Sequence, residues 1–500
     1  MRFPERVLHA LAVAAIAGGC TESGTALNVA PTLSSLAVEP LELVPAFSPD
    51  VHDYVVRCGP GGSSVSVVTE APPGVVATVR PLDAPTAVRT TGVSMNVEED
   101  QPIIVDVSSS AGNDAYWVRC LPHDFPWLTV QTHPEAGTRA PGWYVLGNAT
   151  PARNETGFVM VLDSRGTPVW YRRVATGGAL STDVLADGVI AYVPALGYYG
   201  TDPSARYVLQ QLSPWQSRTI SAVDAPIDEH ELRILPNGDV LVFAYEQLPG
   251  VDLQGLQSFG SDETIADCTV QEIDPQGKLV WRWRASDHVD PARESTGPEA
   301  DPMGATTVVD VFHFNSIDVD AHGNLLLSSR NTSAVYYVER PGGRVLWKLG
   351  GAPYSKDGAQ IIRVVGDPEG GFGSQHDARF QAEGHVSMFD DHTGLAGAAR
   401  GIEYAIDFGA GTARVAWSYI GPGNAGALGS FRRYPDGSSV IAWGLPSDPT
   451  RFAGAFTEVD GAGHDLMDVT FQQGDSTYRA FKVPQPTLDI SVLRATAGRP

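Results

Sequence analysis

The chain has 500 residues, of which 43% are hydrophobic and 18% charged, a composition typical of globular proteins and not of disordered ones. Its formal net charge of −24 argues against nucleic acid as a partner, because no basic stripe offsets the acidic residues. The 53 glycines and 37 prolines predict an all-β fold with many tight turns. A chain of this length is expected to form about two to four domains.

The N-terminus has the pattern of an export signal. Arg2 and Arg6 precede a short apolar run over residues 7–17, which is too short to span a membrane. The run ends in Ala17-Gly18-Gly19-Cys20, which resembles the bacterial lipoprotein signal. This resemblance implies that residues 1–20 are a lipoprotein-type signal peptide and that Cys20 becomes lipid-modified. Ordinary signal cleavage near the same place is the alternative.

Both interpretations predict a protein of the cell envelope, periplasmic or at the surface, in which residues 21–30 form a tether. The protein would then touch the membrane only through a lipid anchor on Cys20. Because Thr21 and not Asp follows the cysteine, we expect the outer membrane.

The other cysteines fit an oxidising compartment. Cys58 and Cys120 each close a strand-like run, over residues 54–58 and 116–120. A disulfide between them is plausible and would stabilise the protein by roughly 4 kcal/mol. Cys268 is left over and is expected to be a buried free thiol. No Cys and His spacing in the chain is typical of a zinc site.

Residues 31–122 predict a small β-domain. Apolar residues alternate in short runs such as Leu33-Ser-Ser-Leu36 and Tyr54-Val-Val56, and Pro and Gly break the runs. With Phe47-Ser-Pro49-Asp50 between them, these runs resemble the cadherin-like β-sandwich found at the front of many bacterial surface proteins. The resemblance implies a β-sandwich domain with a spacing or docking role.

From Trp143 onward, two sequence elements recur. One is a turn followed by a strand that ends in Trp, and the other is a polar residue, a short strand, a Gly turn and a second strand. The first element ends at Trp170, Trp281, Trp347 and Trp417. The second element begins at Asp183, His230, His313, His376 and Ser430.

The leading residues of the second element are 47, 83, 63 and 54 residues apart, a spacing typical of propeller blades of about four strands. Five copies are visible, and the two ends of the domain, from about residue 143 and over residues 456–483, could together close a sixth. We therefore predict a six-bladed β-propeller over residues 140–485.

Three of the twelve histidines stand out because His230, His313 and His376 occupy the same position in successive repeats. Equivalent positions of propeller blades lie on a ring around the central axis, so these three side chains are expected to converge in the channel. A lone histidine is more often a structural group. Five others were assigned to that class because they fall in turns or irregular stretches: His288, His322, His385, His392 and His464.

Several runs around these histidines resemble the bacterial arylsulfotransferase family. They are Phe312-His313-Phe314-Asn315-Ser316-Ile317-Asp318, Val345-Leu346-Trp347-Lys348-Leu349-Gly350-Gly351 and Ser374-Gln375-His376-Asp377-Ala378-Arg379. The resemblance spans about residues 143–483 and is most specific over residues 230–400. It implies a six-bladed propeller that moves a sulfuryl group from an aryl sulfate donor to a phenolic acceptor. Neither a nucleotide donor nor a metal or other cofactor is needed in that family.

Site residues follow from the same resemblance, position by position. His376 matches the histidine that is transiently sulfated, and His230 matches the histidine of the preceding blade. His313, Asn315 and Arg330 match the family's HxN…R segment, with Asn315 in contact with substrate. The family's later threonine contact has no clear counterpart near Gly429-Ser430, which leaves the choice of acceptor open.

Sulfuryl transfer chemistry agrees with this set of side chains. A neutral imidazole can attack and leave again, and the guanidinium of Arg330 offers a fixed fork of donors to sulfate oxygens. Two further imidazoles can hold oxygens or move the phenolic proton. Three histidines could also bind zinc. We expect no metal, because Arg330 would lie poorly beside a divalent cation.

Two alternatives to the enzyme stay open. A non-catalytic propeller lipoprotein could bind an anionic small molecule or a partner protein, since propellers host many functions. The complete set of three histidines, Asn315 and Arg330 favours the enzyme. A propeller that holds a quinone cofactor or processes sugars is the weakest alternative, because no pair of carboxylates typical of glycoside cleavage can be identified.

Overall fold

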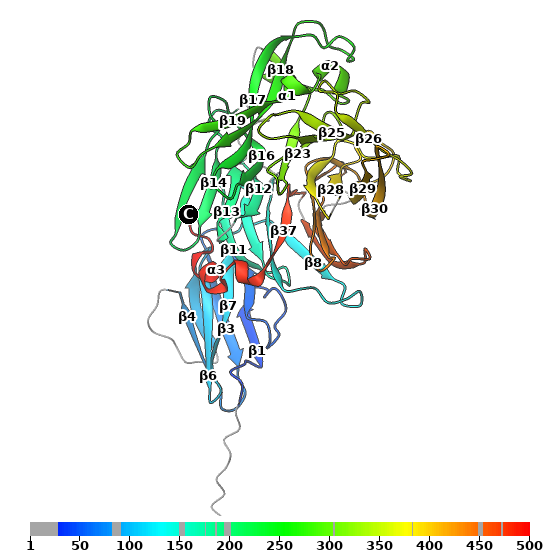
Figure 1. The fold of residues 1–500 in the computed structure, drawn as a ribbon. Helices are drawn as coiled ribbons and strands as arrows, with labels where there is room; N and C mark the ends of the chain where they lie inside the picture. Colours follow the sequence, from blue (N-terminus) through cyan, green and yellow to red (C-terminus); the bar gives the residue numbers. More distant parts are fainter. Residues whose placement is uncertain are drawn as a thin grey trace, which may run out of the picture.

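The computed structural model describes residues 29–82, 92–149, 156–175, 177–185, 188–194, 202–303, 306–382, 384–448, 454–471 and 474–500. The predicted signal peptide, Cys20 and most of the predicted tether therefore lie outside the described residues. The described chain is all-β, with a small domain below and a larger ring of sheets above it (Figure 1). None of the described helices is long and apolar enough to cross a membrane.

The small domain consists of two sheets around one core. The first sheet has the order β1 (Ser35–Glu39), β3 (Ser63–Glu70), β5 (Gly92–Val97). The second has the order β2 (Asp53–Arg57), β7 (Gly112–Leu121), β6 (Pro102–Ser109), β4 (Val76–Pro81). Inward side chains such as Val67, Val105 and Tyr116 are almost fully buried between the sheets. This is a two-sheet β-structure; its likeness to cadherin domains stays a prediction.

A disulfide joins Cys58, directly after β2, to Cys120 in β7, with their Cα atoms 5.6 Å apart. The two strands are parallel neighbours, and Val56 lies opposite Cys120 in their register. The predicted pairing is therefore confirmed. Cys268 is a free and fully buried thiol, also as predicted.

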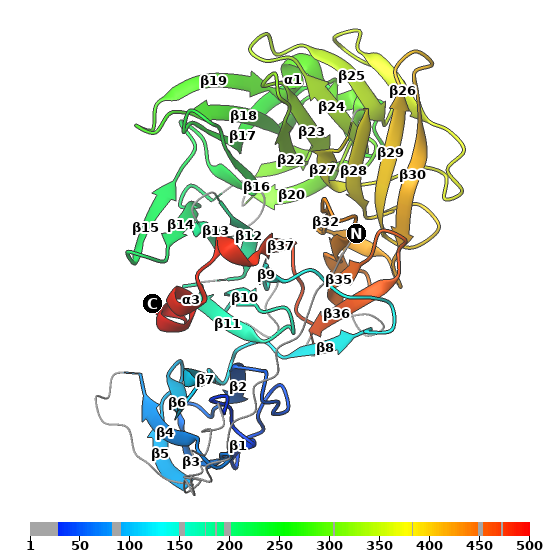
Figure 2. The same cartoon turned by 60° about the horizontal axis from the view of Figure 1, so that its bottom comes forward.

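Each predicted repeat of the larger domain forms an antiparallel sheet whose strands follow one another along the chain. The first two of these sheets consist of β12 (Ala179–Val184), β13 (Ile190–Pro194), β14 (Tyr207–Gln211) and β15 (Gln216–Ile220), and of β16 (Ile227–Ile234), β17 (Val240–Val251), β18 (Glu263–Ile273) and β19 (Leu279–Arg284). The next two consist of β22 (Phe314–Val319), β23 (Leu325–Ser329), β24 (Ala334–Val338) and β25 (Val345–Gly350), and of β27 (His376–Phe380), β28 (His385–Asp390), β29 (Arg400–Asp407) and β30 (Thr412–Ile420). Figure 2 shows these sheets arranged around a common centre.

The two ends of the larger domain close the ring. The last strand, β37 (Ala480–Pro484), pairs with β9 (Gly142–Gly147) and so completes the sheet that continues through β10 (Phe158–Leu162) to β11 (Pro168–Arg173). The remaining sheet runs through β32 (Ser430–Arg433), β33 (Ser439–Ala442), β35 (Gly454–Val459), β36 (Asp465–Phe471) and β8 (Leu128–Thr132).

This pairing corrects one part of the expected closure. Residues 456–471 were expected to join the sheet of β9. They belong instead to the sheet of β32, and only β37 pairs with β9. The strand β8 also lies outside the predicted boundary at residue 140, because its residues Leu128–Thr132 pair with β36. Both ends of the domain are thus held by strand pairs between segments more than 300 residues apart in sequence.

The second repeat element forms the innermost strand of its sheet and the strand that follows it. The inner strands β12, β16, β22 and β27 each contain a register shift, which is the signature of a β-bulge. The first repeat element forms the turn into the outermost strand, and this strand contains the tryptophan of each repeat. Trp281 on β19 donates its indole N–H to the carbonyl of Pro341, in a turn of the next sheet, over 3.0 Å.

The remaining elements are short. They are α1 (Ala285–His288), α2 (Pro291–Glu294), β20 (Glu299–Met303), β21 (Thr306–Asp310), β26 (Gln360–Val364), β31 (Ala425–Ala427), β34 (Leu445–Pro446), the 3-10 helix η3 (Gln485–Thr487) and α3 (Ile490–Thr496). The hairpin of β20 and β21 is attached to β18 at Ile265, opposite Val309.

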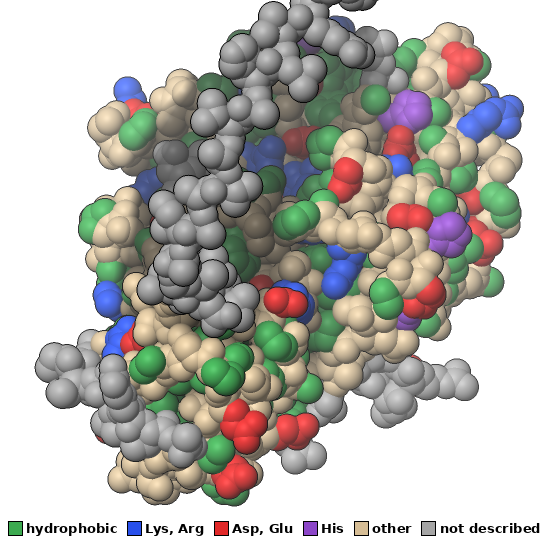
Figure 3. All heavy atoms as spheres, turned by 90° about the horizontal axis from the view of Figure 1, so that it is seen from below, with side chains coloured by type: hydrophobic (Ala, Val, Ile, Leu, Met, Phe, Trp, Pro, Cys, Tyr) green, Lys and Arg blue, Asp and Glu red, His purple; other side chains and the backbone are tan. Residues whose placement is uncertain are grey.

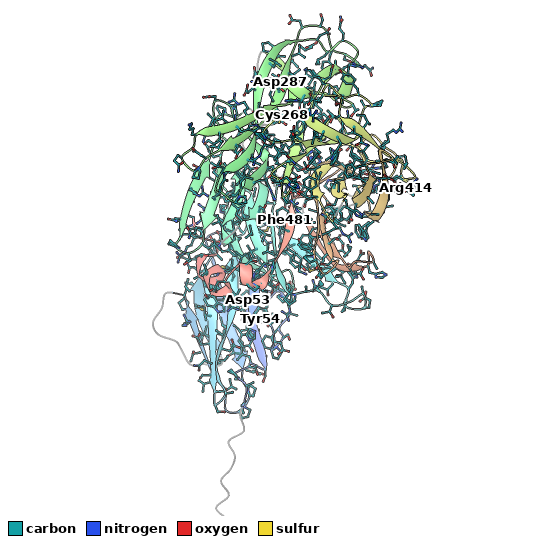
Figure 4. All side chains as sticks on the ribbon, in the orientation of Figure 1. Asp53, Tyr54, Cys268, Asp287, Arg414 and Phe481 are labelled. Carbon is teal, nitrogen blue, oxygen red and sulfur yellow. A yellow bond between two sulfur atoms is a disulfide. The ribbon has the colours of Figure 1, made fainter. Side chains whose placement is uncertain are left out.

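Helix α3 joins the two domains. Its Arg494 donates to both carboxylate oxygens of Asp53 on β2, over 2.8 and 2.7 Å. Arg119 of β7 donates in turn to the carbonyl oxygens of Arg494 and Ala497. Figure 4 labels Asp53 and Tyr54 at this junction, directly below the helix. The small domain is therefore fixed to the ring through charged hydrogen bonds.

Replacing both Cys58 and Cys120 by Ala should lower the free energy of unfolding by about 4 kcal/mol, because the bond closes a long loop in the unfolded chain. Denaturant unfolding under oxidising conditions measures this difference. A reducing agent should bring the parent protein to the stability of the variant. Equal stabilities under oxidising conditions would contradict the prediction.

Candidate active site

The structure brings the three predicted histidines together at the centre of the ring. The Nε2 atoms of His230 and His313 are 3.2 Å apart, and the ring of His376 lies 6.4 Å from each of the other two rings between centroids. All three side chains are buried. One ligand-type nitrogen from each lies within 4.8 Å of the others.

Every one of these rings is held by a carboxylate at Nδ1. The pairs are His230 with Asp228 over 2.8 Å, His313 with Asp310 over 2.8 Å and His376 with Asp391 over 2.7 Å. An Nδ1–H that donates to a carboxylate fixes both the tautomer and the orientation of the ring. The Nε2 atoms therefore face the shared centre.

Two of the carboxylates also shape the backbone. Asp228 accepts from the backbone N–H of His230 over 2.9 Å, and Asp310 accepts from that of His313 over 3.0 Å. His313 itself has a φ of 51°, in the left-handed region that a non-glycine residue rarely adopts. Backbone strain of this kind is typical of functional sites, where the surroundings hold an unfavourable conformation.

The three imidazoles do not carry the same charge. Burial lowers the pKa of His376 well below its usual value, and His230, His313 and Arg330 lower it further. For His230, burial acts in the same direction, but Asp228 outweighs it and the pKa is raised. The 3.2 Å distance between the two Nε2 atoms allows a hydrogen bond in which one of the two rings contributes the proton.

Arg330 lies at the rim of this centre and is held in one orientation. Its Nη1 donates to Glu299 over 2.6 Å and to the side chain of Asn331 over 2.8 Å, and its Nη2 donates to the carbonyl of Gly426 over 3.1 Å. Its Nε is buried and has no hydrogen-bond partner among the described residues. The same is true of Nε2 of His376. These two atoms are a donor and an acceptor available to a ligand.

Asn315 is fully buried and lies two residues after His313 in the chain. Its side-chain amide donates to the carbonyl of Gln375 over 2.8 Å, directly before His376. This contact supports a role in positioning β27. Contact of Asn315 with substrate stays a prediction.

Below the histidines lies a buried ionic network that the sequence did not reveal. Arg479 donates to Glu231 over 2.9 Å, and Arg379 donates to both Glu231 and Asp377. Burial alone would raise the pKa of Glu231, but Arg379 and Arg479 lower it well below the usual range. Figure 3 shows that the face of the molecule seen from below is hollowed, with Lys and Arg side chains inside the hollow.

Sequence reasoning missed several residues that contact the histidines. The three carboxylates were not assigned, although the spacing Asp228-Glu229-His230 was a signal for one of them. Tyr478 packs its ring against His230 and His376, with centroids 5.6 and 6.0 Å apart. No local pattern marked Tyr478, because it comes from the segment before β37 at the other end of the domain.

The three Nε2 atoms could also hold a metal ion. Metal-bound histidines typically have a carboxylate at their other ring nitrogen, and each of these three has one within 2.8 Å of Nδ1. Two further groups of potential ligands lie among the described residues, one of them around His133 with Asp465 and Asp468. The lowered pKa of His376 and the hydrogen-bonding contact between His230 and His313 fit an anionic ligand as well.

The fold and this centre define an all-β protein with a buried imidazole site, and one family model matches the part of the chain that contains it. The model described as Arylsulfotransferase (ASST) matches residues 204–426, which include the three histidines and Arg330 but less than half of the chain. No curated protein matches the chain.

Solved structures show only distant likeness. A protein of unknown function from Bacteroides caccae has 13% identity and a TM-score of 0.43, covering 69% of this chain and 100% of its own. A quinonprotein alcohol dehydrogenase-like protein from Bacteroides thetaiotaomicron has 9% identity and a TM-score of 0.35, covering 88% and 99%. These likenesses carry no information on function.

At pH 6.5, where an unperturbed histidine is half protonated, His376 should be neutral, because burial and its charged neighbours lower its pKa. We expect its proton on Nδ1, which lies 2.7 Å from the Asp391 side chain, even though burial raises the pKa of that carboxyl. Nitrogen NMR on selectively labelled protein reports both the charge and the tautomer. An Asp391→Asn variant, whose amide can donate to Nδ1, should shift the proton to Nε2. An imidazolium at pH 6.5 in the parent protein would contradict this assignment.

Proposed function

We propose that this protein is an aryl-sulfate sulfotransferase that works through a sulfated His376. The observation that carries the proposal is the buried Nε2 of His376, which has no hydrogen-bond partner among the described residues while Asp391 holds the opposite nitrogen. The match of residues 204–426 to the arylsulfotransferase model supports the same reaction. The donor is an aryl sulfate and the acceptor a phenol.

In the first step, the lone pair on Nε2 of His376 attacks the sulfur of the donor ester. The N–S bond forms as the bond between sulfur and the aryl oxygen breaks, and the departing phenolate keeps the electron pair. The phenolate then takes the proton held between His230 and His313, and a neutral phenol leaves. Arg330 donates from its Nε to an equatorial sulfuryl oxygen and stabilises the charge there.

The second step reverses the first with another phenol. The acceptor gives its proton back to the His230–His313 pair, and its oxygen attacks the sulfur on His376. The N–S bond breaks, and Nε2 regains its lone pair. No electrons, nucleotide or water are consumed, so the cycle needs only donor and acceptor.

The scaffold that we propose for this site is a six-bladed β-propeller. Each antiparallel sheet of the ring would be one blade, and the blade that contains β9 would be closed by β37. This architecture accounts for the position of His230, His313 and His376 on equivalent inner strands or directly before them.

Brief exposure to 4-nitrophenyl sulfate without acceptor should add one sulfuryl group, about 80 Da, to the peptide of His376. His376→Ala should abolish both this adduct and nitrophenol release, because no other side chain can form the same intermediate. Arg330→Ala should slow transfer by about 10²–10³-fold, the usual cost of losing a donor to the transition state. Mass spectrometry of the peptide and the nitrophenol absorbance measure these effects.

The outcomes separate the alternatives. Binding of aryl sulfates without adduct or nitrophenol release, across several phenols, would reject the transferase and leave a binding module. Loss of activity with a chelator, restored by a metal ion, would show that the three histidines act as metal ligands. Removal of metal is expected to change nothing.

We propose further that the protein is an envelope lipoprotein anchored through Cys20, with the small domain between the anchor and the ring. The support is the run Ala17-Gly18-Gly19-Cys20 together with the disulfide Cys58–Cys120, a bond that persists in oxidising compartments.

A Cys20→Ala variant should be released in soluble form, whereas the parent should sediment with membranes, because the lipid on Cys20 is the proposed anchor. Fractionation of cells that express each form measures the difference. A Cys268→Ala variant is the matched control and should sediment like the parent. A parent protein found wholly in the soluble periplasmic fraction would reject the anchor.

A further inference from the structure

The carboxylate of Glu299 is a hydrogen-bond partner of Arg330 that has no role in the proposed reaction. It accepts from Nη1 of Arg330 over 2.6 Å, and 39% of the Glu299 side chain is exposed, compared with 10% of the Arg330 side chain. The guanidinium that would receive the substrate anion is therefore already paired with a negative charge at its solvent side.

Glu299 is placed there by the fold. It lies in the hairpin of β20 and β21, directly opposite Asp310, the carboxylate that holds His313. The hairpin is attached to β18 through the pair Ile265 and Val309. Glu299 thus belongs to the same hairpin as the carboxylate that holds His313, and its partly exposed side chain reaches Arg330 from there.

The geometry leaves Arg330 able to bind an anion in the presence of Glu299. Glu299 and Asn331 take the hydrogens of Nη1, and Gly426 takes one hydrogen of Nη2. The Nε–H is buried and has no partner among the described residues, and it lies on the edge of the guanidinium away from Nη1 and its partner Glu299. An anion on that edge would feel the negative charge of Glu299 through the guanidinium plane.

We infer that Glu299 sets the charge of the anion that this site accepts, and that it favours singly charged sulfate esters over doubly charged phosphate esters. The inference rests on the proposed function, because it takes Arg330 as the receptor of the substrate anion. A fixed negative charge repels a ligand in proportion to the ligand's own charge, so a dianion loses about twice the binding free energy that a monoanion loses. Sulfate and phosphate esters, which have the same tetrahedral shape, would thereby be distinguished by their charge.

The test uses two unreactive aryl anions that differ in charge, benzenesulfonate as the monoanion and phenylphosphonate at alkaline pH as the dianion. Glu299→Gln keeps an oxygen that can accept from Nη1, so the position of Arg330 is retained while the charge is removed. The variant should bind benzenesulfonate about threefold more tightly and phenylphosphonate about tenfold more tightly than the parent, in calorimetric titrations of the full chain.

Glu272→Gln is the matched control. Glu272 accepts from Arg340 over 2.7 Å, a carboxylate–guanidinium contact of the same kind outside the site. This variant should change neither dissociation constant. Thermal unfolding of all forms shows whether each variant is folded before its affinities are compared.

Equal gains for both anions, no gain, or weaker binding in Glu299→Gln would overturn the inference and show that Glu299 only holds Arg330 in place. Absence of binding of either anion to both proteins would overturn it as well. The proposed function fails separately, if 4-nitrophenyl sulfate gives neither adduct nor turnover while the charge-dependent gain is still observed. Turnover in the parent without that gain leaves the transferase standing and rejects only the role of Glu299.

Discussion

The close contact between a buried carboxylate and the Nδ1 of each histidine, a hydrogen bond for His230 and His376 and an ion-pair distance for His313, is the interaction on which the centre depends. An imidazole has two nitrogens that can point either way, so three buried rings without such partners would have no defined arrangement. With Asp228, Asp310 and Asp391 in place, the Nε2 atoms converge within 4.8 Å. Because these pairs lie in a medium of low polarity, each bond is stronger than in water and each unpaired partner would be costly.

The closure of the ring supplies the other condition. The three histidines are separated by 83 and 63 residues, and only the circular arrangement of sheets brings their strands to one axis. The strand β37 both completes the sheet of β9 and carries Tyr478 and Arg479, directly before it, to the histidine centre. Assembly of the fold and assembly of the site are therefore coupled through one strand.

Local periodicity was enough to predict the all-β fold, the disulfide and the convergence of His230, His313 and His376, because the Gly turn after each inner strand marks the register. Partners that come from hairpin geometry could not be found in this way. Asp391 meets His376 because β28 pairs back along β27, with Phe389 opposite His376, and that register was not visible in the sequence.

Other features escaped prediction because they depend on distant pairing. The strand β8 joins β36 across more than 300 residues, and no repeat marks either strand as a partner. Asp310 belongs to the hairpin of β20 and β21, an addition to its sheet that the repeats do not contain. The resemblance to arylsulfotransferases named Arg330 and Asn315, but only the structure shows that Glu299 and Gln375 bind their side chains.

The charges around the site explain how an acidic protein can select an anion. The buried network below the histidines has two carboxylates and three guanidiniums: Glu231, Asp377, Arg379, Arg432 and Arg479. Burial penalises charged groups, so these five are stable together as hydrogen-bonded pairs, and their guanidiniums offset part of the negative charge of the carboxylates at the histidines. Arg479 contributes to the lowered pKa of His376, which keeps that imidazole neutral. The net charge of −24 repels anions from the surface, so under the proposed function the arginines and histidines of the axis supply the attraction for the aryl sulfate.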